Sequence, residues 1–98
     1  MRVEFHPEAE LELIEAASYY ELQVPGLGGD FEVEVRRATD LLQQHPGIGP
    51  QLDDELRRFV LNRFPYTLIY SVSSTVLHIL VVAHQSRRPG YWRSRVSR

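Results

Sequence analysis

Apolar residues recur every three or four positions along two stretches of the first half of the chain, which predicts two amphipathic helices. The first helix is expected to begin at Pro7, a residue that suits the first helical turn, and to end near Gln23. The second is expected to begin after a cap at Gly29 or Asp30 and to stop at His45. The two apolar stripes consist of Ala9, Leu13, Ala16 and Tyr20, and of Phe31, Val35, Ala38 and Leu42. Because the connection is short and rich in glycine, the helices should form an antiparallel hairpin.

Strand-like patterns flank this hairpin on both sides. Residues 2–5 alternate before the first helix, and the runs 57–63, 66–72 and 75–84 follow the second. The last run is apolar on both faces, which places it in the middle of a sheet. Segregated helices and consecutive strands indicate an α+β fold of order β-α-α-β-β-β, with the hairpin on one face of an antiparallel sheet. The other sheet face is expected to be open to a partner, and a short basic tail begins at Gln85.

Charge is distributed unevenly along the chain. All 13 Asp and Glu residues lie in residues 1–55, with three arginines, whereas residues 56–98 contain eight arginines and no acid. The formal charges are therefore −10 and +8, although the total is −2. An all-cationic half should attract phosphates or an acidic protein. The chain has no lysine, which a compositional bias toward arginine would also explain, but such a bias does not account for the missing acids.

Composition narrows the classes of protein further. A chain of 98 residues with 43% apolar residues predicts one domain, residues 1–98, with one modest core. Cysteine is absent, so disulfides and thiolate metal sites are excluded. No apolar run is long enough to span a membrane, and no signal peptide is recognisable at the start, so a cytoplasmic protein is expected. Neither a cofactor nor a metal site is predicted.

The candidate chemistry gathers at the end of the last strand. An imidazole, several guanidiniums, a phenol and an indole lie within about a dozen residues, an arrangement typical of nucleic-acid contact. The members are His84, Arg87, Arg88, Tyr91, Trp92, Arg93 and Arg95. His84 has two interpretations, as an acid or base acting on a ribose hydroxyl or as a residue that ties the tail to the sheet. Tyr91 and Trp92 are either base-stacking residues or anchors of the tail on the core, and we expect them to dock.

Other histidines and charged residues are interpreted from their expected positions in the fold. Strand alternation predicts that His78 shares a sheet face with His84. Glu8, Glu10, Glu12 and Glu15 resemble paired carboxylates, but they are expected on the solvated side of the first helix and are not assigned to catalysis. The alternation of the strand 57–63 places Phe59 and Leu61 on one face and Arg58 on the other.

Short motifs spread along the whole chain resemble the RelE/ParE superfamily of type II toxin–antitoxin toxins, in its ParE-like or plasmid stabilization branch. The final block, which contains His84, Arg87, Pro89, Tyr91, Trp92 and Arg95, is the most specific. The other matching pieces are Phe5-His6-Pro7-Glu8-Ala9, Tyr19-Tyr20, Gly26-Leu27-Gly28, His45-Pro46, Arg58-Phe59, Arg63-Phe64-Pro65-Tyr66 and Ile69-Tyr70. The fold of such toxins agrees with the fold predicted above.

The resemblance implies a toxin that a small antitoxin neutralises, by wrapping an acidic C-terminal segment around it. It implies antitoxin contacts at Leu13, Tyr20, Arg58, Arg63, Tyr70 and His84, and target contacts at Arg87, Arg88, Tyr91, Arg93 and Arg95. Members of the superfamily either inhibit DNA gyrase, without being enzymes, or cleave mRNA in the ribosome. If the chain were a nuclease, its catalytic residues would be Arg58, Arg63, His84, Arg87 and Tyr91.

The absence of lysine favours gyrase inhibition, because ribosome-dependent nucleases of the superfamily often place lysines on the middle strands. RNA cleavage stays open as the alternative, since arginine, histidine and tyrosine support that chemistry in some members. A third hypothesis, a general single-stranded nucleic-acid-binding module, fits the arginines but not the order of motifs.

Overall fold

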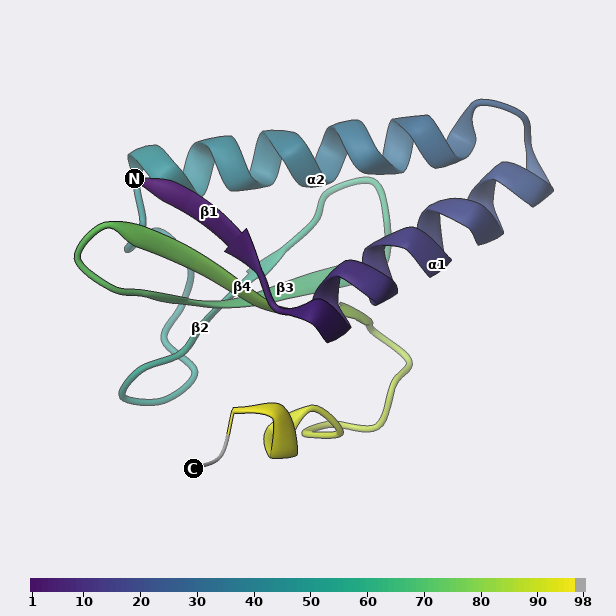
Figure 1. Cartoon of the computed structure of the whole chain (residues 1–98). Coiled ribbons are helices and arrows are strands. Elements are labelled where there is room, and N and C mark those ends of the chain that lie inside the picture. Colours follow the sequence, from purple (N-terminus) through teal and green to yellow (C-terminus); the bar gives the residue numbers. More distant parts are fainter. Residues whose placement is uncertain (97–98) are drawn as a thin grey trace.

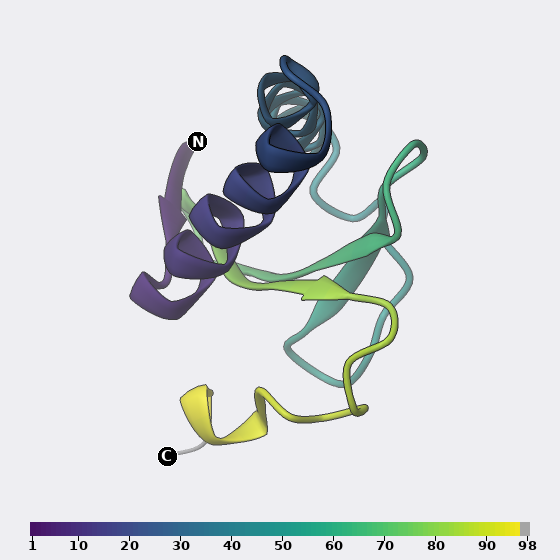
Figure 2. The same cartoon turned by 90° about the vertical axis from the view of Figure 1, so that its right-hand side faces the viewer.

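The structure, a computed structural model, describes residues 1–96 and arranges them in three layers. The helices form the first layer, the sheet the second, and the C-terminal segment the third, on the side of the sheet away from the helices (Figures 1 and 2). The elements follow the predicted order. They are β1 (Arg2–Phe5), α1 (Pro7–Gln23), α2 (Leu27–Gln44), β2 (Arg57–Val60), β3 (Tyr66–Val72), β4 (Val76–His84) and the 3-10 helix η1 (Arg93–Arg95).

The four strands form a mixed sheet in the order β1-β4-β3-β2. Strands β2, β3 and β4 are antiparallel neighbours, as predicted. Strand β1 instead runs parallel to β4, with Phe5 opposite Ile79. The hairpin and two strands separate β1 from β4, and this long crossover brings β1 in beside β4 in the same direction. The most apolar strand, β4, therefore lies between two neighbours, as its pattern predicted.

Helix α1 has its predicted bounds, but α2 begins at Leu27, before the predicted cap at Gly29 or Asp30. Gly26 adopts a left-handed conformation (φ 92°) just before α2, which favours glycine. At Gly28, an added Cβ would lie 2.4 Å from the carbonyl oxygen of Ala17, so glycine here allows the two helices to approach closely. The carboxylate of Glu21 accepts hydrogen bonds from the amides of Gly26 and Gly28, which stabilises the start of α2. The glycines therefore serve helix packing as well as the turn.

Strand β2 is shorter than the predicted 57–63 and ends at Val60. Beyond it, Glu34 of α2 accepts hydrogen bonds from the amides of Asn62 and Arg63, at 2.8 and 2.9 Å. The helix layer thus supplies the partner that a neighbouring strand would otherwise provide. The predicted alternation is confirmed, because Phe59 packs toward the helices and Arg58 does not.

We call the sheet surface covered by α1 and α2 the helix face. Its core is a continuous cluster of apolar side chains from both helices and from the sheet. Phe31 is fully buried there, with its ring centroid 5.1 Å from that of Phe64 and 5.0 Å from that of Tyr66. This face contains most of the predicted apolar stripes, including Ala9, Ala16, Val35, Ala38 and Leu42.

The opposite surface, the tail face, is partly covered rather than open to a partner as predicted. Trp92 is 5% exposed and packs with Leu56, Ile69 and Val81 in a second, smaller apolar cluster. The tail folds back beneath the sheet (Figure 2) because the indole removes apolar surface of β3 and β4 from water. The prediction that Trp92 docks on the sheet is confirmed, and the expected open face is reduced to a hollow beside the tail.

Candidate functional site

A β-bulge at Leu80 determines which side chains of β4 reach each face. Ile79 lies opposite Tyr70 and Val81 lies opposite Ile69, so Leu80 is an extra residue without a partner on β3. Residues before and after the bulge therefore alternate out of phase. His78 lies beside the hollow on the tail face, whereas His84 packs against Tyr66 on the helix face. The prediction that the two histidines share a face is wrong, because it assumed uninterrupted alternation.

One side chain of α1 and two of the tail, about 80 residues away in the sequence, meet at the edge of β4 just after the bulge. The carboxylate of Glu12 forms a two-point ion pair with the guanidinium of Arg95, with N···O distances of 2.9 and 3.1 Å. The hydroxyl of Tyr91 donates to the same carboxylate at 2.5 Å. Only 13% of the Glu12 side chain and 12% of the Arg95 side chain are exposed. This Glu12–Tyr91–Arg95 cluster fixes the tail to α1.

The same cluster satisfies backbone groups that no strand reaches. Pairing of β1 with β4 ends at Ile79. Beyond that point, the amide of Val82 donates to Glu12 at 3.0 Å, and Arg95 donates to the carbonyl of Leu80 at 3.1 Å. A side-chain acid and base therefore replace a strand neighbour at the bulge.

Protonation within the cluster follows from these contacts. Burial alone would raise the pKa of Glu12, but hydrogen bonds from Arg95, Tyr91 and the Val82 amide outweigh it and lower that pKa. Burial, followed by the hydrogen bond to Glu12, raises the pKa of Tyr91 to about 12. Glu12 is thus held as a carboxylate and Tyr91 as a neutral phenol that donates a hydrogen bond.

The arginines of the second half are neutralised unevenly. Arg63 pairs with Asp30 at 3.8 Å and Arg93 pairs with Asp53 at 3.2 Å, in addition to the pair between Arg95 and Glu12. Acids of the first half therefore neutralise part of the positive charge that the second half carries on its own. Within residues 1–96, Arg58, Arg87 and Arg88 take part in no ion pair and are exposed.

The predicted target-contact residues separate into two groups. Arg87 and Arg88 are exposed, and the guanidinium carbon of Arg87 lies 3.8 Å from the centroid of the Tyr91 ring. Arg93 is also exposed and stacks on Trp92 at 4.5 Å. Arg95 is nearly buried in its ion pair, so little of its side chain is accessible for the target contact, which stays a prediction. Its charge stabilises the attachment of the tail.

Three of the five residues assigned to a nuclease site come together. His84, Arg87 and Tyr91 lie around the end of β4, where His84 and Arg87 line a shallow groove of about 150 Å³ with Glu12, Glu15, Tyr19 and Tyr66. The Nδ1 atom of His84 is within hydrogen-bonding distance of the amide and hydroxyl of Ser86, at 3.0 and 2.8 Å. Arg58 lies opposite Ile69 on the tail face, and Arg63 pairs with α2. The two remaining arginines thus belong to other surfaces.

The residues assigned to antitoxin contacts also differ in accessibility. Tyr70 is fully buried, and its hydroxyl donates to the carbonyl of Pro46 and accepts from the amide of Gly49. The antitoxin contact at Tyr70 stays a prediction, and in this structure the side chain is not accessible. Leu13 and Tyr20 are half-buried against the helix-face core, and only their outer edges are accessible. A row of rings, Tyr20, Tyr66 and His84, connects α1 with the groove at the end of β4.

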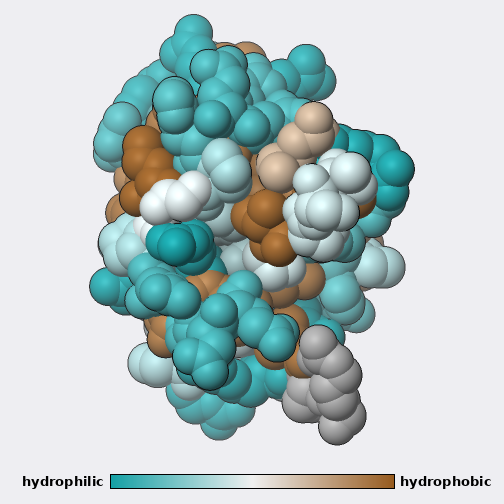
Figure 3. Space-filling view, turned by 90° about the vertical axis from the view of Figure 1, so that its left-hand side faces the viewer, coloured by the Kyte–Doolittle hydropathy of each residue, from teal (hydrophilic) through white to brown (hydrophobic). Residues whose placement is uncertain are grey.

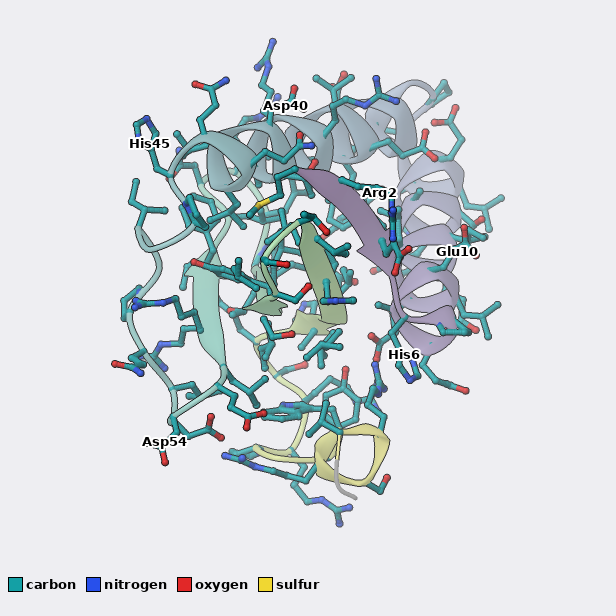
Figure 4. All side chains as sticks on the ribbon, turned by 60° about the vertical axis from the view of Figure 1, so that its left-hand side comes forward. Arg2, His6, Glu10, Asp40, His45 and Asp54 are labelled. Carbon is teal, nitrogen blue, oxygen red and sulfur yellow. The ribbon has the colours of Figure 1, made fainter. Side chains whose placement is uncertain are left out.

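Glu12 is the principal residue that sequence reasoning missed, because the glutamate series was assigned as a whole to the solvated side of α1. The position of Glu12 contained a usable signal. It lies three residues after Ala9 and four before Ala16, which are both buried, and this spacing places it at the border of the core stripe. Glu10, by contrast, points away from the sheet (Figure 4).

The described part of the chain has neither a cluster of metal-binding side chains nor a membrane-spanning helix. No group of three or more His, Asp or Glu side chains in residues 1–96 is placed to hold a metal ion. Over the same residues, no helix is both long and apolar enough to cross a membrane.

A helical hairpin on a four-stranded mixed sheet, with a basic tail attached beneath it, defines the class of small α+β toxins that the motifs suggested. The family model described as "ParE toxin of type II toxin-antitoxin system, parDE" matches residues 3–89. The chain therefore belongs to the ParE toxin family of type II toxin–antitoxin systems.

A solved structure supports the fold independently. A chain described as "Chromosomal ParDE TA system from P. aeruginosa" superposes with a TM-score of 0.74 at 20% sequence identity. The match covers 86% of this chain and 95% of the other. No curated protein sequence matches the chain.

Proposed function

We propose that this ParE-family toxin inhibits DNA gyrase by presenting a basic surface on its tail, and that it does so without catalysing a reaction. The observation that carries the proposal is that some tail residues are buried and fix the tail, whereas others are exposed and carry unpaired charge. Glu12 holds Tyr91 and Arg95 in place, while Arg87 and Arg88 are exposed and form no ion pair in the described structure. A fixed tail with free guanidiniums is suited to recognising an acidic or phosphate-rich surface.

The positions of Tyr91, Arg58 and Arg63 provide few of the groups that RNA cleavage requires. Such a nuclease must remove a proton from a 2′-hydroxyl and return one to the leaving oxygen. The Tyr91 hydroxyl already donates to Glu12, and its pKa of about 12 makes it a poor proton donor or acceptor near neutral pH. Arg58 and Arg63, which would complete the charge stabilisation, lie on other surfaces. These features support an inhibitor rather than an enzyme.

We place the antitoxin in the groove between α1 and the end of β4. His84 and Arg87 line this groove, and Tyr20 packs beside Tyr66, which lines it as well. No strand lies beside β4 beyond Ile79, but Glu12 and Arg95 already occupy the Val82 amide and the Leu80 carbonyl there, so we expect side-chain contacts with the antitoxin in the groove rather than strand pairing. An acidic segment would also neutralise the exposed arginines of the tail, and the same contact would block the target surface.

The direct test compares two activities of the purified wild-type protein. We expect inhibition of DNA supercoiling by gyrase, and intact mRNA in a ribosome-programmed translation reaction. A preparation mixed with the small protein encoded beside it serves as the control, and this partner should restore supercoiling and co-purify with the toxin. Cuts at defined codon positions in the mRNA, with supercoiling unaffected, would establish the nuclease instead.

A further inference from the structure

Helix α1 carries a second apolar stripe on the side opposite its core. It consists of three apolar residues and one serine: Leu11, Ile14, Ser18 and Leu22 follow one another at spacings of three, four and four, the repeat that aligns side chains on one helix face. Leu11 and Ile14 are 53% and 52% exposed, and Leu22 is 86% exposed. The buried side of the same helix holds Ala9, Ala16 and Ala17, so α1 is apolar on both sides. Exposed apolar residues aligned in this way mark an interaction surface.

Glutamates border this outer stripe on both sides. Helix α1 contains five glutamates and no arginine or lysine. Glu12 is neutralised by Arg95, and Glu21 binds the start of α2. Glu8, Glu10 and Glu15 form no ion pair within residues 1–96, and Glu10 points away from the sheet in Figure 4. These carboxylates, of which Glu8 also interacts electrostatically with Arg95, give the borders of the stripe a negative charge.

This charge restricts what can cover the stripe. A second copy of the chain, docked through the same face, would bring glutamates against glutamates and add like-charge repulsion to the contact. The acidic antitoxin segment proposed above is disfavoured on the stripe for the same reason, whereas in the groove at the end of β4 it would meet Arg87 as well as Glu15. A partner with cationic flanks gains attraction at both borders while its apolar residues cover the leucines.

The geometry of the stripe suggests the shape of the partner. From Leu11 to Leu22 the helix rises about 17 Å, roughly three turns. A helix laid along it can match its apolar residues at the same three- and four-residue spacing. The surface is already ordered, because Ala9, Ala16 and Ala17 fix α1 to the core, and binding then loses little conformational entropy on this side.

We propose that the outer face of α1, formed by Leu11, Ile14, Ser18 and Leu22 with Glu8, Glu10 and Glu15 at its borders, is a docking surface for a basic amphipathic helix of a partner protein. It adjoins the groove at the end of β4, which Glu15 also lines, but Leu11, Ile14 and Leu22 do not line that groove. The inference does not rest on gyrase inhibition.

The test uses the purified chain and two fluorescent probe peptides of about 18 residues. One has leucines on one helical face and lysines on the other, and the second has glutamates in place of the lysines. We expect the leucine–lysine peptide to bind and the leucine–glutamate peptide not to bind. The triple variant Leu11→Ser, Ile14→Ser, Leu22→Ser should bind the first peptide about tenfold more weakly. Glu8→Gln with Glu15→Gln should weaken it less and reduce its dependence on salt.

Val33→Ser is the matched control, since Val33 of α2 is 49% exposed and lies outside the stripe. It should bind like the wild type, and thermal unfolding should show that all variants are folded. Equal affinity of the triple variant and the wild type for the leucine–lysine peptide would overturn the proposal. Binding of the leucine–glutamate peptide with equal affinity would do the same, as would a wild-type dimer that the triple variant abolishes.

Discussion

The two faces of the sheet are closed in different ways. On the helix face, two long helices cover a continuous apolar cluster that includes Phe31, Leu68 and Ile79, all fully buried. On the tail face, one indole covers three buried side chains, and the Glu12–Tyr91–Arg95 cluster fixes the segment that supplies the indole. The first face depends on buried area and the second on a few specific contacts.

This difference has a consequence for stability and function. Loss of a side chain from the helix face should weaken the whole fold, because that cluster joins both helices to the sheet. Loss of a contact on the tail face should mainly release the tail, since local regions with few contacts open below the global unfolding free energy. The exposed arginines lie on or beside the segment that such opening would displace.

Phe31→Ala should have the largest effect. Removal of a fully buried ring that contacts Tyr20, Phe64 and Tyr66 should lower the free energy of unfolding by about 3–5 kcal/mol. Urea denaturation followed by circular dichroism measures it. A loss below about 1 kcal/mol would mean that the helix face is not the main source of stability.

Trp92→Ala should cost about 2–4 kcal/mol, and its effect should be local. Amide hydrogen exchange is the measurement. The amide of Arg95, which donates to the carbonyl of Trp92, should lose protection, while helix α2 keeps it. Equal loss of protection in α2 and in the tail would show that the two faces unfold as one unit.

Glu12→Gln should lower the free energy of unfolding by about 2 kcal/mol near neutral pH, because it removes the charge that Arg95 pairs with. The pKa of Glu12 in the folded protein lies below its ordinary value of 4.5. Its stabilising contribution is therefore present above that pH and is lost as the pH falls through the folded pKa. The difference between wild type and variant should accordingly shrink in acid, and a difference that stays constant down to low pH would contradict the ion-pair account.

Tyr91→Phe should have the smallest effect, about 1 kcal/mol, since one hydrogen bond is removed and the ring remains. Its clearer signature is titration. The wild type should contain a phenol that ionises near pH 12, absent from the variant, in ultraviolet difference spectra. Because the folded pKa is raised above 10, this phenol stabilises the fold below pH 10 and loses that contribution as the pH rises toward 12. A Tyr91 phenolate that forms near pH 10 would indicate that the hydroxyl does not contact Glu12.

Most of the helix face could be predicted from the sequence. The spacing of Ala9, Leu13, Ala16 and Tyr20 and the bounds of α1 were predictable because helical periodicity is a local property. The start of α2 was missed because Gly28 looks like a loop residue until the carbonyl of Ala17 is seen beside it. The parallel placement of β1 beside β4 depends on the whole chain between them, and no local pattern encodes it.

The tail face was less predictable. The docking of Trp92 could be expected from its size, but the roles of Glu12, Arg95 and Tyr70 depend on contacts between distant segments. The bulge at Leu80 has no sequence signal in a strand that is apolar on both faces. It places His78 and His84 on opposite faces of the sheet. Similarly, the cationic field inferred from the sequence could not show which arginines would meet Asp30, Asp53 or Glu12 in the fold.

The proposed role of the tail face is tested most directly by gyrase supercoiling with three variants of the purified protein. Arg87→Gln with Arg88→Gln should raise the concentration needed for inhibition by about tenfold or more. His84→Gln should inhibit like the wild type, and so should Arg36→Gln with Arg37→Gln, which removes two exposed charges from α2 instead. Full inhibition by the Arg87/Arg88 variant, or its loss in His84→Gln with the fold intact, would contradict the account.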